Sequence, residues 1–129
     1  TEEYNKLLDE FGTRDLQVLG LGPNGHVAFN EPGKFLNKRT SIIELTDQTI
    51  EANSRFFDSK EDVPKYAISM GMADAFNAKT LIVIANGKNK KEVVKKLLKT
   101  DKISTDFPAS LLLLHPNCYL FVDKEAIED

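Results

Sequence analysis

The chain has 129 residues, 41% of them hydrophobic and 29% charged, and its 17 basic and 20 acidic side chains give a formal charge of −3. This balance favours one globular domain and argues against a disordered chain, a fibrous repeat or a nucleic-acid binder with a broad basic surface. Cys118 is the only cysteine, so no intrachain disulfide or cysteine-rich zinc site can form, and a reducing cytoplasm is the expected location. No apolar run approaches the roughly 20 residues of a membrane helix, and no signal peptide is evident.

The spacing of apolar and turn-forming residues predicts helices that alternate with strands. In the first half of the chain we expect a helix over 4–11, a strand over 16–19, an extended segment over 41–45, a helix over 47–55 capped by Thr46, and a short strand or connector over 66–70. In the second half we expect helices over 72–78, 88–99 and 108–114 and strands over 81–85 and 118–122. Residues 81–85 are apolar throughout, as strands buried in a parallel sheet are. The alternation is typical of the α/β class with a largely parallel sheet, and residues 1–129 contain no linker that would divide them.

A glycine-rich loop follows the first predicted strand. Residues 20–25 read GLGPNG and match the GxGxxG pattern of dinucleotide-binding folds. That fingerprint must open a long helix whose N-terminus receives the pyrophosphate. Pro32 and Gly33 interrupt the chain shortly after the loop, so a dinucleotide site is disfavoured.

Functional groups are dense after this loop. Asn24, His26, Asn30 and Glu31 lie within eight residues, at the C-terminal end of a strand, where open α/β sheets bind their ligands. An imidazole exchanges protons near neutral pH, and a nearby carboxylate can orient it or stabilise its charged form. We therefore expect His26 to be a general acid and base, with Glu31 as its partner; the alternative is that the glycines only turn the chain.

An anion site is expected after the strand over 81–85. Gly87 ends that strand and a helix begins within a few residues, so backbone amides, the helix dipole and the Lys90 ammonium could converge on a phosphate. Arg55 could add a forked grip that lysine cannot make. Most other lysines of residues 88–102 are expected to form a solvated face. His115 is expected to be a structural hydrogen-bonding residue, and Cys118 to be inert packing.

Residues 19–33, LGLGPNGHVAFNEPG, closely resemble the signature of glucosamine-6-phosphate deaminases. Further segments match the family in order and at nearly its spacing, namely 39–40 (RT), 52–57 (ANSRFF), 63–71 (VPKYAISMG), 87–90 (GKNK) and 114–116 (LHP). The resemblance spans essentially the whole chain. The related 6-phosphogluconolactonases share the fold but lack the Phe-Asn-Glu-Pro run of residues 29–32. The implied fold is Rossmann-like, with three layers and a mostly parallel sheet, of which this chain resembles the C-terminal part.

The resemblance implies isomerisation and deamination of glucosamine 6-phosphate to fructose 6-phosphate and ammonia in amino-sugar catabolism, without a metal or an organic cofactor. In the family, the residue matching His26 opens the sugar ring, and those matching Glu31 and Asn24 orient and tune it. The residues matching Arg55 and Lys90 bind the sugar phosphate. Family members have Asp or Asn at the position of Asn24, and the Asn found here is expected to affect the protonation and tautomer of His26 more than the activity.

The family's phosphate-cradling loop and its separate Asp base are not found in residues 1–129. With the start at Thr1 rather than Met, this predicts a fragment that is inactive or nearly so by itself. Alternatives are a galactosamine-6-phosphate deaminase, a 6-phosphogluconolactonase and a non-catalytic sugar-phosphate sensor. The expected partner is an amino-sugar phosphate, with no nucleic acid and no membrane; a homo-oligomer is compatible with the sequence.

Overall fold

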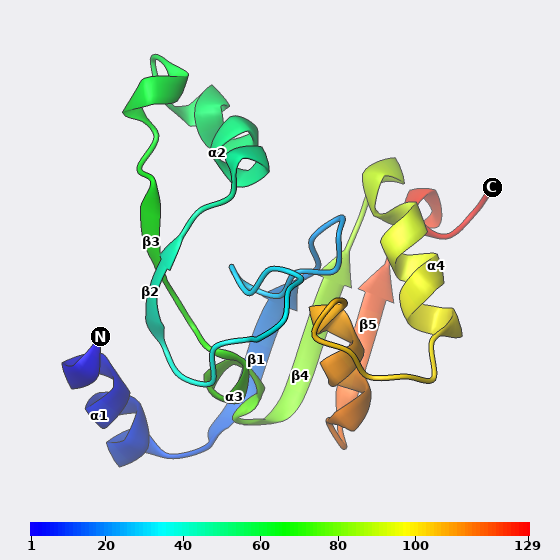
Figure 1. Cartoon of the computed structure of the whole chain (residues 1–129). Coiled ribbons are helices and arrows are strands. Elements are labelled where there is room, and N and C mark those ends of the chain that lie inside the picture. The colour runs from blue at the N-terminus through cyan, green and yellow to red at the C-terminus, as the bar shows by residue number, and fades with distance from the viewer.

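The computed structural model describes all residues, 1–129, and contains a three-stranded sheet and a separate two-stranded ribbon (Figure 1). The sheet has the order β1 (Arg14–Gly20), β4 (Ala78–Ala85), β5 (Cys118–Val122), and both pairings are parallel. Because the strands are parallel, their C-terminal ends meet at one edge of the sheet. The α/β class and the parallel sheet expected from the sequence are confirmed.

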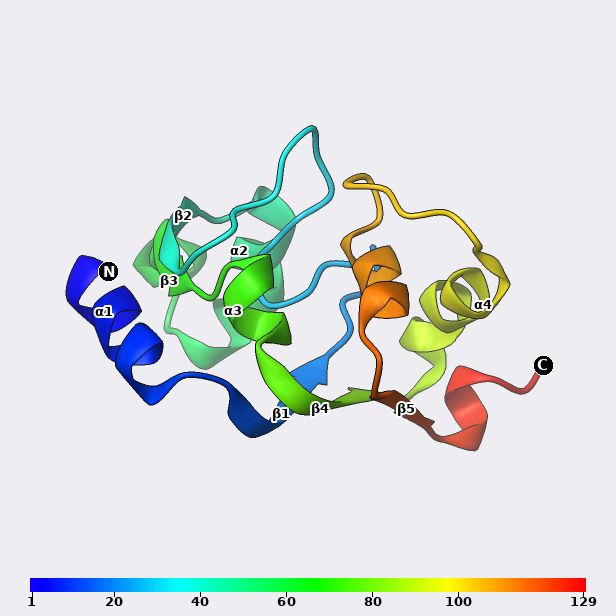
Figure 2. The same ribbon diagram turned by 90° about the horizontal axis from the view of Figure 1, so that it is seen from below.

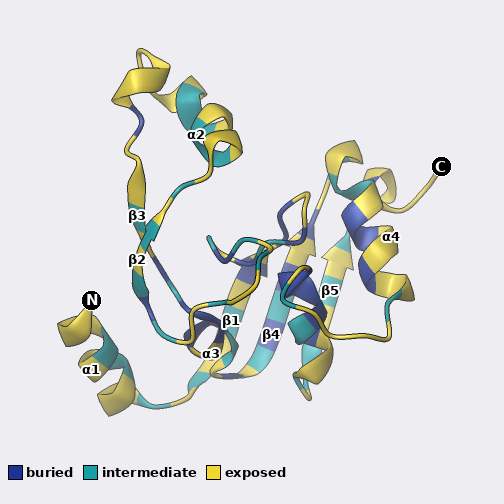
Figure 3. Cartoon of the chain, in the orientation of Figure 1, coloured by how far each residue is buried: buried dark blue, intermediate teal, exposed yellow.

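The helical segments beside the sheet pack on the same face of it, as Figure 2 shows for α3 (Met72–Phe76), α4 (Lys91–Lys99) and η4 (Pro108–Leu114). Side chains of alternate strand residues point into this layer, and the dark segments in Figure 3 mark the core that results. Its most buried large members include Leu81, Val83, Val94 and Val27. The opposite face of the sheet is exposed, so within residues 1–129 helices cover one face of the sheet only.

A ribbon of β2 (Ser41–Glu44) and β3 (Tyr66–Ser69) lies outside the parallel sheet. The two strands pair antiparallel, with Ile42 opposite Ile68. Between them the chain forms α2 (Asp47–Asn53) and the short helix η1 (Ser54–Phe56), and this lobe projects away from the parallel sheet (Figure 1). The sequence predicted both extended segments but not that they pair with each other.

Most predicted helices are present, with differences at their ends. The Thr46 cap is confirmed, because its hydroxyl accepts a hydrogen bond from the Thr49 N–H at 3.1 Å. The expected helix after Gly87 begins as a 3-10 turn, η3 (Lys88–Lys90), before α4, and η4 is a 3-10 helix rather than an α-helix. None of the helices is long and apolar enough to span a membrane.

A buried carboxylate joins three parts of the fold. Asp74 of α3 accepts hydrogen bonds from the backbone N–H of Thr40 at 2.6 Å, from its hydroxyl at 3.0 Å and from Arg39 Nε at 3.0 Å. Arg39 also contacts Asp9 of α1 (Glu2–Phe11) at 3.0 Å. These contacts fix α1 and the start of the ribbon relative to α3.

Candidate active site

The glycine-rich loop leaves the C-terminal end of β1 and folds back on itself. The Gly22 N–H donates to the His26 carbonyl at 3.0 Å, and the Gly25 N–H donates to the Gly22 carbonyl at 2.9 Å. Gly25 has φ +88°, and a Cβ there would lie 2.3 Å from the ring of Phe107. Only glycine fits this position, because it tolerates both the left-handed conformation and the close approach of the ring.

The residues after the loop are anchored to the end of the ribbon. The buried side chain of Asn30 donates to the carbonyls of Val27 at 3.0 Å and Met70 at 2.7 Å. The Phe29 N–H donates to Ser69 Oγ at 3.1 Å. Asn30 therefore has a structural role. It holds the segment that carries His26 and Glu31 against the residues that follow β3.

His26 is fixed by its own loop. Its Nδ1 donates to the Ala28 carbonyl at 2.7 Å, and Ala28 adopts φ +52°, which is rare for a residue other than glycine. A neutral imidazole that donates from Nδ1 has its lone pair on Nε2, and an imidazolium can keep the same Nδ1 bond. A proton can therefore move on and off Nε2 without a change in the position of the ring.

The ring of His26 also requires Gly22. A Cβ on Gly22 would lie 2.0 Å from His26 Cδ2 and 2.1 Å from Nε2, so any side chain there would displace the imidazole. By contrast, nothing lies within 4 Å of a Cβ at Gly20. Gly22, the second glycine of the GxGxxG pattern, is thus required by the position of the His26 ring and not by contact with a pyrophosphate.

Glu31 lies beside His26 but does not bond to its ring. Its Oε2 accepts from Asn24 Nδ2 at 2.8 Å, and Asn24 Oδ1 accepts the backbone N–H of His26 at 3.1 Å. Neither Glu31 nor Asn24 therefore bonds to the imidazole that they were expected to orient; Glu31 reaches only the backbone of His26, through Asn24. The other carboxylate oxygen accepts from the Thr49 hydroxyl on α2 at 3.3 Å.

These groups surround a cavity of about 90 Å³. It is lined by Pro23, Asn24, His26, Glu31, Gln48, Thr49 and Ala52. Gln48, Thr49 and Ala52 belong to α2, so the protruding lobe forms one wall of the site. The sequence did not predict Gln48 and Thr49 as site residues, because their only signal is a position just after the Thr46 helix cap, which is common to any helix. Ala52 lies in the matched segment 52–57 but was given no role.

Lys90 reaches the same loop from the neighbouring strand. Because β4 pairs with β1, the turn after β4 lies next to the turn after β1, and Lys90 Nζ donates to the Leu21 carbonyl. Partial burial lowers the pKa of Lys90 below its ordinary value of 10.5. The structure therefore brings Lys90 to the edge that carries the His26 loop, whereas the Gly87 N–H, which was expected to face the anion, donates to the Asp123 carboxylate at 3.0 and 3.1 Å.

Arg55 stands apart from the other four candidate residues. It lies on η1, three residues beyond Ala52 of the cavity wall, and is exposed. Its guanidinium lies over the ring of Phe56 at 4.7 Å from the centroid, and no hydrogen bond or ion pair joins it to His26, Glu31 or Lys90. The structure thus places Arg55 on the lobe, stacked over Phe56, and does not bring it into the lining of the His26 cavity.

His115 differs from His26 in the direction of its bonds. Its Nδ1 accepts the Asn117 N–H at 3.1 Å, so its Nε2 is the donor to the Ala78 carbonyl at 2.8 Å. Protonation would break the first bond, and the expectation of a structural role is confirmed. The half-buried Cys118 packs against the core, and burial raises the pKa of its thiol, which agrees with an inert side chain.

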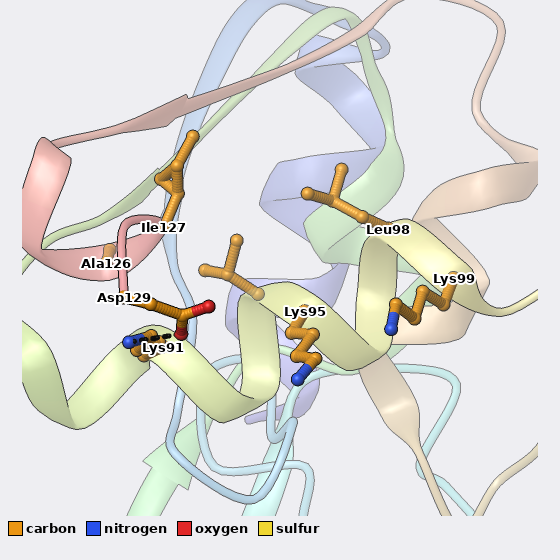
Figure 4. Close-up of a pocket in the computed structure, with 8 residues that line it drawn as sticks. Lys91, Lys95, Leu98, Lys99, Ala126, Ile127 and Asp129 are labelled. Atoms are coloured by element: carbon orange, nitrogen blue, oxygen red, sulfur yellow. Dashed lines mark ion pairs between the residues drawn. The ribbon is translucent and has the colours of Figure 1, made fainter.

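The lysines of α4 largely face solvent. Figure 4 shows Lys91, Lys95 and Lys99 along the groove between α4 and the C-terminal residues. Lys91 pairs with Asp129 at 2.7 Å, and this hydrogen bond lowers the pKa of Asp129. None of the five candidate residues lines this groove. No group of three or more His, Cys, Asp or Glu side chains is placed to hold a metal ion.

Comparisons with known proteins agree with this geometry. Residues 1–120 match the model of the family described as glucosamine-6-phosphate isomerases/6-phosphogluconolactonase. The glucosamine-6-phosphate deaminase of Staphylococcus epidermidis is 50% identical over 128 residues, which cover 99% of this chain and 52% of that protein. The deaminase of Halothermothrix orenii is 49% identical over 97% of this chain and 52% of its own length.

Two solved structures also match nearly the whole of this chain and about half of their own chains. A monomeric glucosamine-6-phosphate deaminase matches 97% of this chain with a TM-score of 0.90 and 44% identity, over 52% of its own chain. The 6-phosphogluconolactonase of Trypanosoma brucei matches with a TM-score of 0.67 and 26% identity, over 97% of this chain and 50% of its own. This chain thus spans about half the length of these relatives. With its fold, its glycine-rich loop and 120 matched residues in agreement, the chain belongs to the glucosamine-6-phosphate isomerase/6-phosphogluconolactonase family.

Proposed function

We propose that this chain supplies the ring-opening half of the active site of a glucosamine-6-phosphate deaminase. The observation that carries the proposal is the Nδ1 bond of His26, which leaves Nε2 able to gain and lose a proton in place. The higher identity to deaminases than to the lactonase, 50% and 44% against 26%, supports the deaminase reaction.

In the proposed reaction, His26 Nε2 takes the proton of the C1 hydroxyl and passes it to the ring oxygen of the sugar, the bond between C1 and the ring oxygen breaks, and the pyranose opens to the aldehyde. Asn24 and Glu31 hold the histidine loop, while Lys90 and Arg55 bind the phosphate through charge-assisted hydrogen bonds. Transfer of a proton from C2 to C1 then converts the open-chain amine to a C2 imine, and hydrolysis of this imine by one water gives the ketose and ammonia, so the net reaction is a hydrolysis of a C–N bond. The group that moves the proton between C1 and C2 is not among the described candidates. Residues 1–129 alone are therefore expected to be inactive.

The proposal is tested by ammonia release from glucosamine 6-phosphate. The first sample is this chain alone, and the second is a chimera in which residues 1–129 replace the matched segment of the Staphylococcus epidermidis deaminase. We expect turnover only from the chimera, and a loss of about 10²- to 10⁴-fold in kcat on His26→Gln, the usual contribution of a general acid or base.

Parallel assays separate the alternatives. Galactosamine 6-phosphate and 6-phosphogluconolactone are offered to the same chimera. The proposal would be contradicted if the chimera preferred the lactone. It would also be contradicted if His26→Gln left the rate of ammonia release by the chimera unchanged. Retained sugar-phosphate binding without any turnover would favour a sensor.

A further inference from the structure

Both carboxylate oxygens of Glu31 are held, and their two donors come from different parts of the fold. Asn24 Nδ2, from the loop that carries His26, donates to Oε2 at 2.8 Å, and the Thr49 hydroxyl lies 3.3 Å from Oε1. Thr49 belongs to α2, on the lobe that projects from the parallel sheet in Figure 1. Of the hydrogen bonds that α2 makes, this one alone reaches the His26 loop. Thr49 therefore joins the lobe to the carboxylate beside the histidine.

The direction of these bonds follows from which groups carry hydrogen. A carboxylate has none to donate, so the Thr49 hydroxyl gives its single hydrogen to Glu31. The Thr49 oxygen in turn accepts the hydroxyl of Thr46 at 3.0 Å. On the other side, Asn24 donates its amide hydrogen to Glu31, and its Oδ1 accepts the backbone N–H of His26 at 3.1 Å. Two chains of hydrogen bonds thus converge on Glu31, and bonds linked in this way polarise one another.

The place of Thr49 in its helix leaves the hydroxyl available for this contact. Thr49 is the third residue of α2, where a Glu or Gln commonly bonds back to the N–H of the cap residue. In α2 the cap bond uses a different atom, because the Thr49 N–H donates to Thr46 Oγ1 at 3.1 Å. The hydroxyl of Thr49 can therefore be removed while the cap bond of the helix remains.

We propose that Thr49 is a positioning residue for the ring-opening step, an inference that rests on the proposed function. Its hydroxyl fixes Oε1 of Glu31, and the fixed carboxylate holds Asn24 in the orientation that accepts the His26 N–H. Without the hydroxyl, the carboxylate is free to rotate, and the backbone at His26 loses the support that places the imidazole. Catalysis is sensitive to such displacements. Thr49 forms no bond to His26, so it acts through Glu31.

The proposal is tested in the chimera described above, by ammonia release from glucosamine 6-phosphate. Thr49→Val removes the hydroxyl but keeps the branched shape of the side chain and the N–H of the cap bond. We expect kcat to fall by about tenfold, the effect of losing one hydrogen bond to a charged group. We expect KM to change by less than about twofold, because the proposed phosphate ligands Lys90 and Arg55 are unaltered. Thr49→Ser retains the hydroxyl and should retain most of the rate.

Two controls separate positioning from general damage to the lobe. Ser59→Ala removes another hydroxyl of the lobe, which donates to the Asp62 carboxylate at 3.2 Å and not to Glu31, and it should leave kcat unchanged. In a Glu31→Ala background, Thr49→Val should cause no further loss, because a residue that acts through Glu31 then has nothing to position. Additive losses would overturn the proposal. So would an unchanged kcat in Thr49→Val, or an equal loss in Thr49→Ser.

Hydrogen exchange tests the same bonds without turnover. In the 129-residue chain, the His26 N–H should exchange faster in Thr49→Val than in Ser59→Ala, by about threefold or more, because its acceptor Asn24 is less firmly held. Equal exchange rates would overturn the proposal, and Thr49→Ala replaces the valine variant if that does not fold. If the chimera releases no ammonia, the proposed function fails and the exchange rates alone decide the role of Thr49. Ammonia release that Thr49→Val leaves unchanged would reject the role of Thr49 and retain the proposed function.

Discussion

His26 and His115 show how hydrogen bonding separates two residues of one type. Both make bonds through Nδ1, but His26 donates to a carbonyl whereas His115 accepts an N–H. The sequence predicted their different roles from their neighbours, a polar loop for His26 and the edge of an apolar strand for His115. It could not predict the bond from His26 to Ala28, because that bond depends on the positive φ of Ala28.

Gly22→Ala should impair the site without unfolding the chain. Its Cβ would lie 2.0 Å from the His26 ring and would push the imidazole away. We expect the deaminase rate of the chimera to fall by about 10²-fold, since misplacement of a catalytic group by about 1 Å has such an effect. Gly20→Ala is the matched control, because its Cβ meets nothing, and it should keep the rate. Equal rates for the two variants would show that the position of the ring does not matter.

Lys90 should lose its proton earlier than an exposed lysine. Burial lowers its pKa below 10.5, so between that lowered pKa and 10.5 the unfolded chain binds more protons than the folded chain. The contribution of this group to stability therefore increases with pH across that interval, while its attraction for a phosphate weakens. Titration of lysine side chains by NMR measures the pKa, and Lys90→Arg identifies the signal by its loss. A midpoint at or above 10.5 would contradict the expectation.

At the scale of elements, the strands were easier to predict than their partners. Residues 81–85 and 118–122 are apolar enough to identify strands, and both lie in the parallel sheet. The segments over 41–45 and 66–70 are just as extended, yet they pair with each other in the ribbon. Their pairing depends on contacts between residues far apart in the chain, such as the bond between Thr40 and Asp74, which no local pattern encodes.

Asp74 should be among the most sensitive polar residues of the fold. It is 6% exposed and accepts three hydrogen bonds from Thr40 and Arg39. Asp74→Ala leaves buried donors unpaired, so we expect the free energy of unfolding to fall by about 3 kcal/mol. Asp9→Ala removes the exposed partner of the same arginine and should change it little, because surface ion pairs contribute little. Urea denaturation of both variants measures the difference, and equal losses would mean that burial of Asp74 is not the cause.

At the scale of the whole molecule, the chain has a core on one side of its sheet only. Val83 and Val94 are 1% exposed on the helical side, whereas Tyr119 and Phe121 are 53% and 55% exposed on the other. The composition did not reveal this asymmetry, because 41% hydrophobic residues is ordinary for a domain with a complete core.

The exposed face of the parallel sheet, which carries Ile84, Tyr119 and Phe121, should therefore bind apolar dyes. We expect the 129-residue chain to enhance the fluorescence of an anilinonaphthalene sulfonate dye, and Ile84→Lys to reduce that enhancement. Because Ile84 is already 46% exposed, the variant should keep its thermal midpoint. Leu98→Lys on α4 is the matched control. Equal dye binding by the two variants would place the dye elsewhere.

By itself, the sequence determined the α/β class, the strand order along the chain and the loop that carries Asn24, His26 and Glu31. These follow from short-range patterns, namely the periodicity of apolar residues, glycines at the ends of strands and a dense set of polar groups after a strand. Only the tertiary structure decided that Asn24 stands between Glu31 and His26, that Thr49 joins them from the lobe, and that one face of the sheet is bare. Each of these depends on side chains brought together by packing between distant segments, and the physical reason is that packing is set by all neighbours at once rather than by the local sequence.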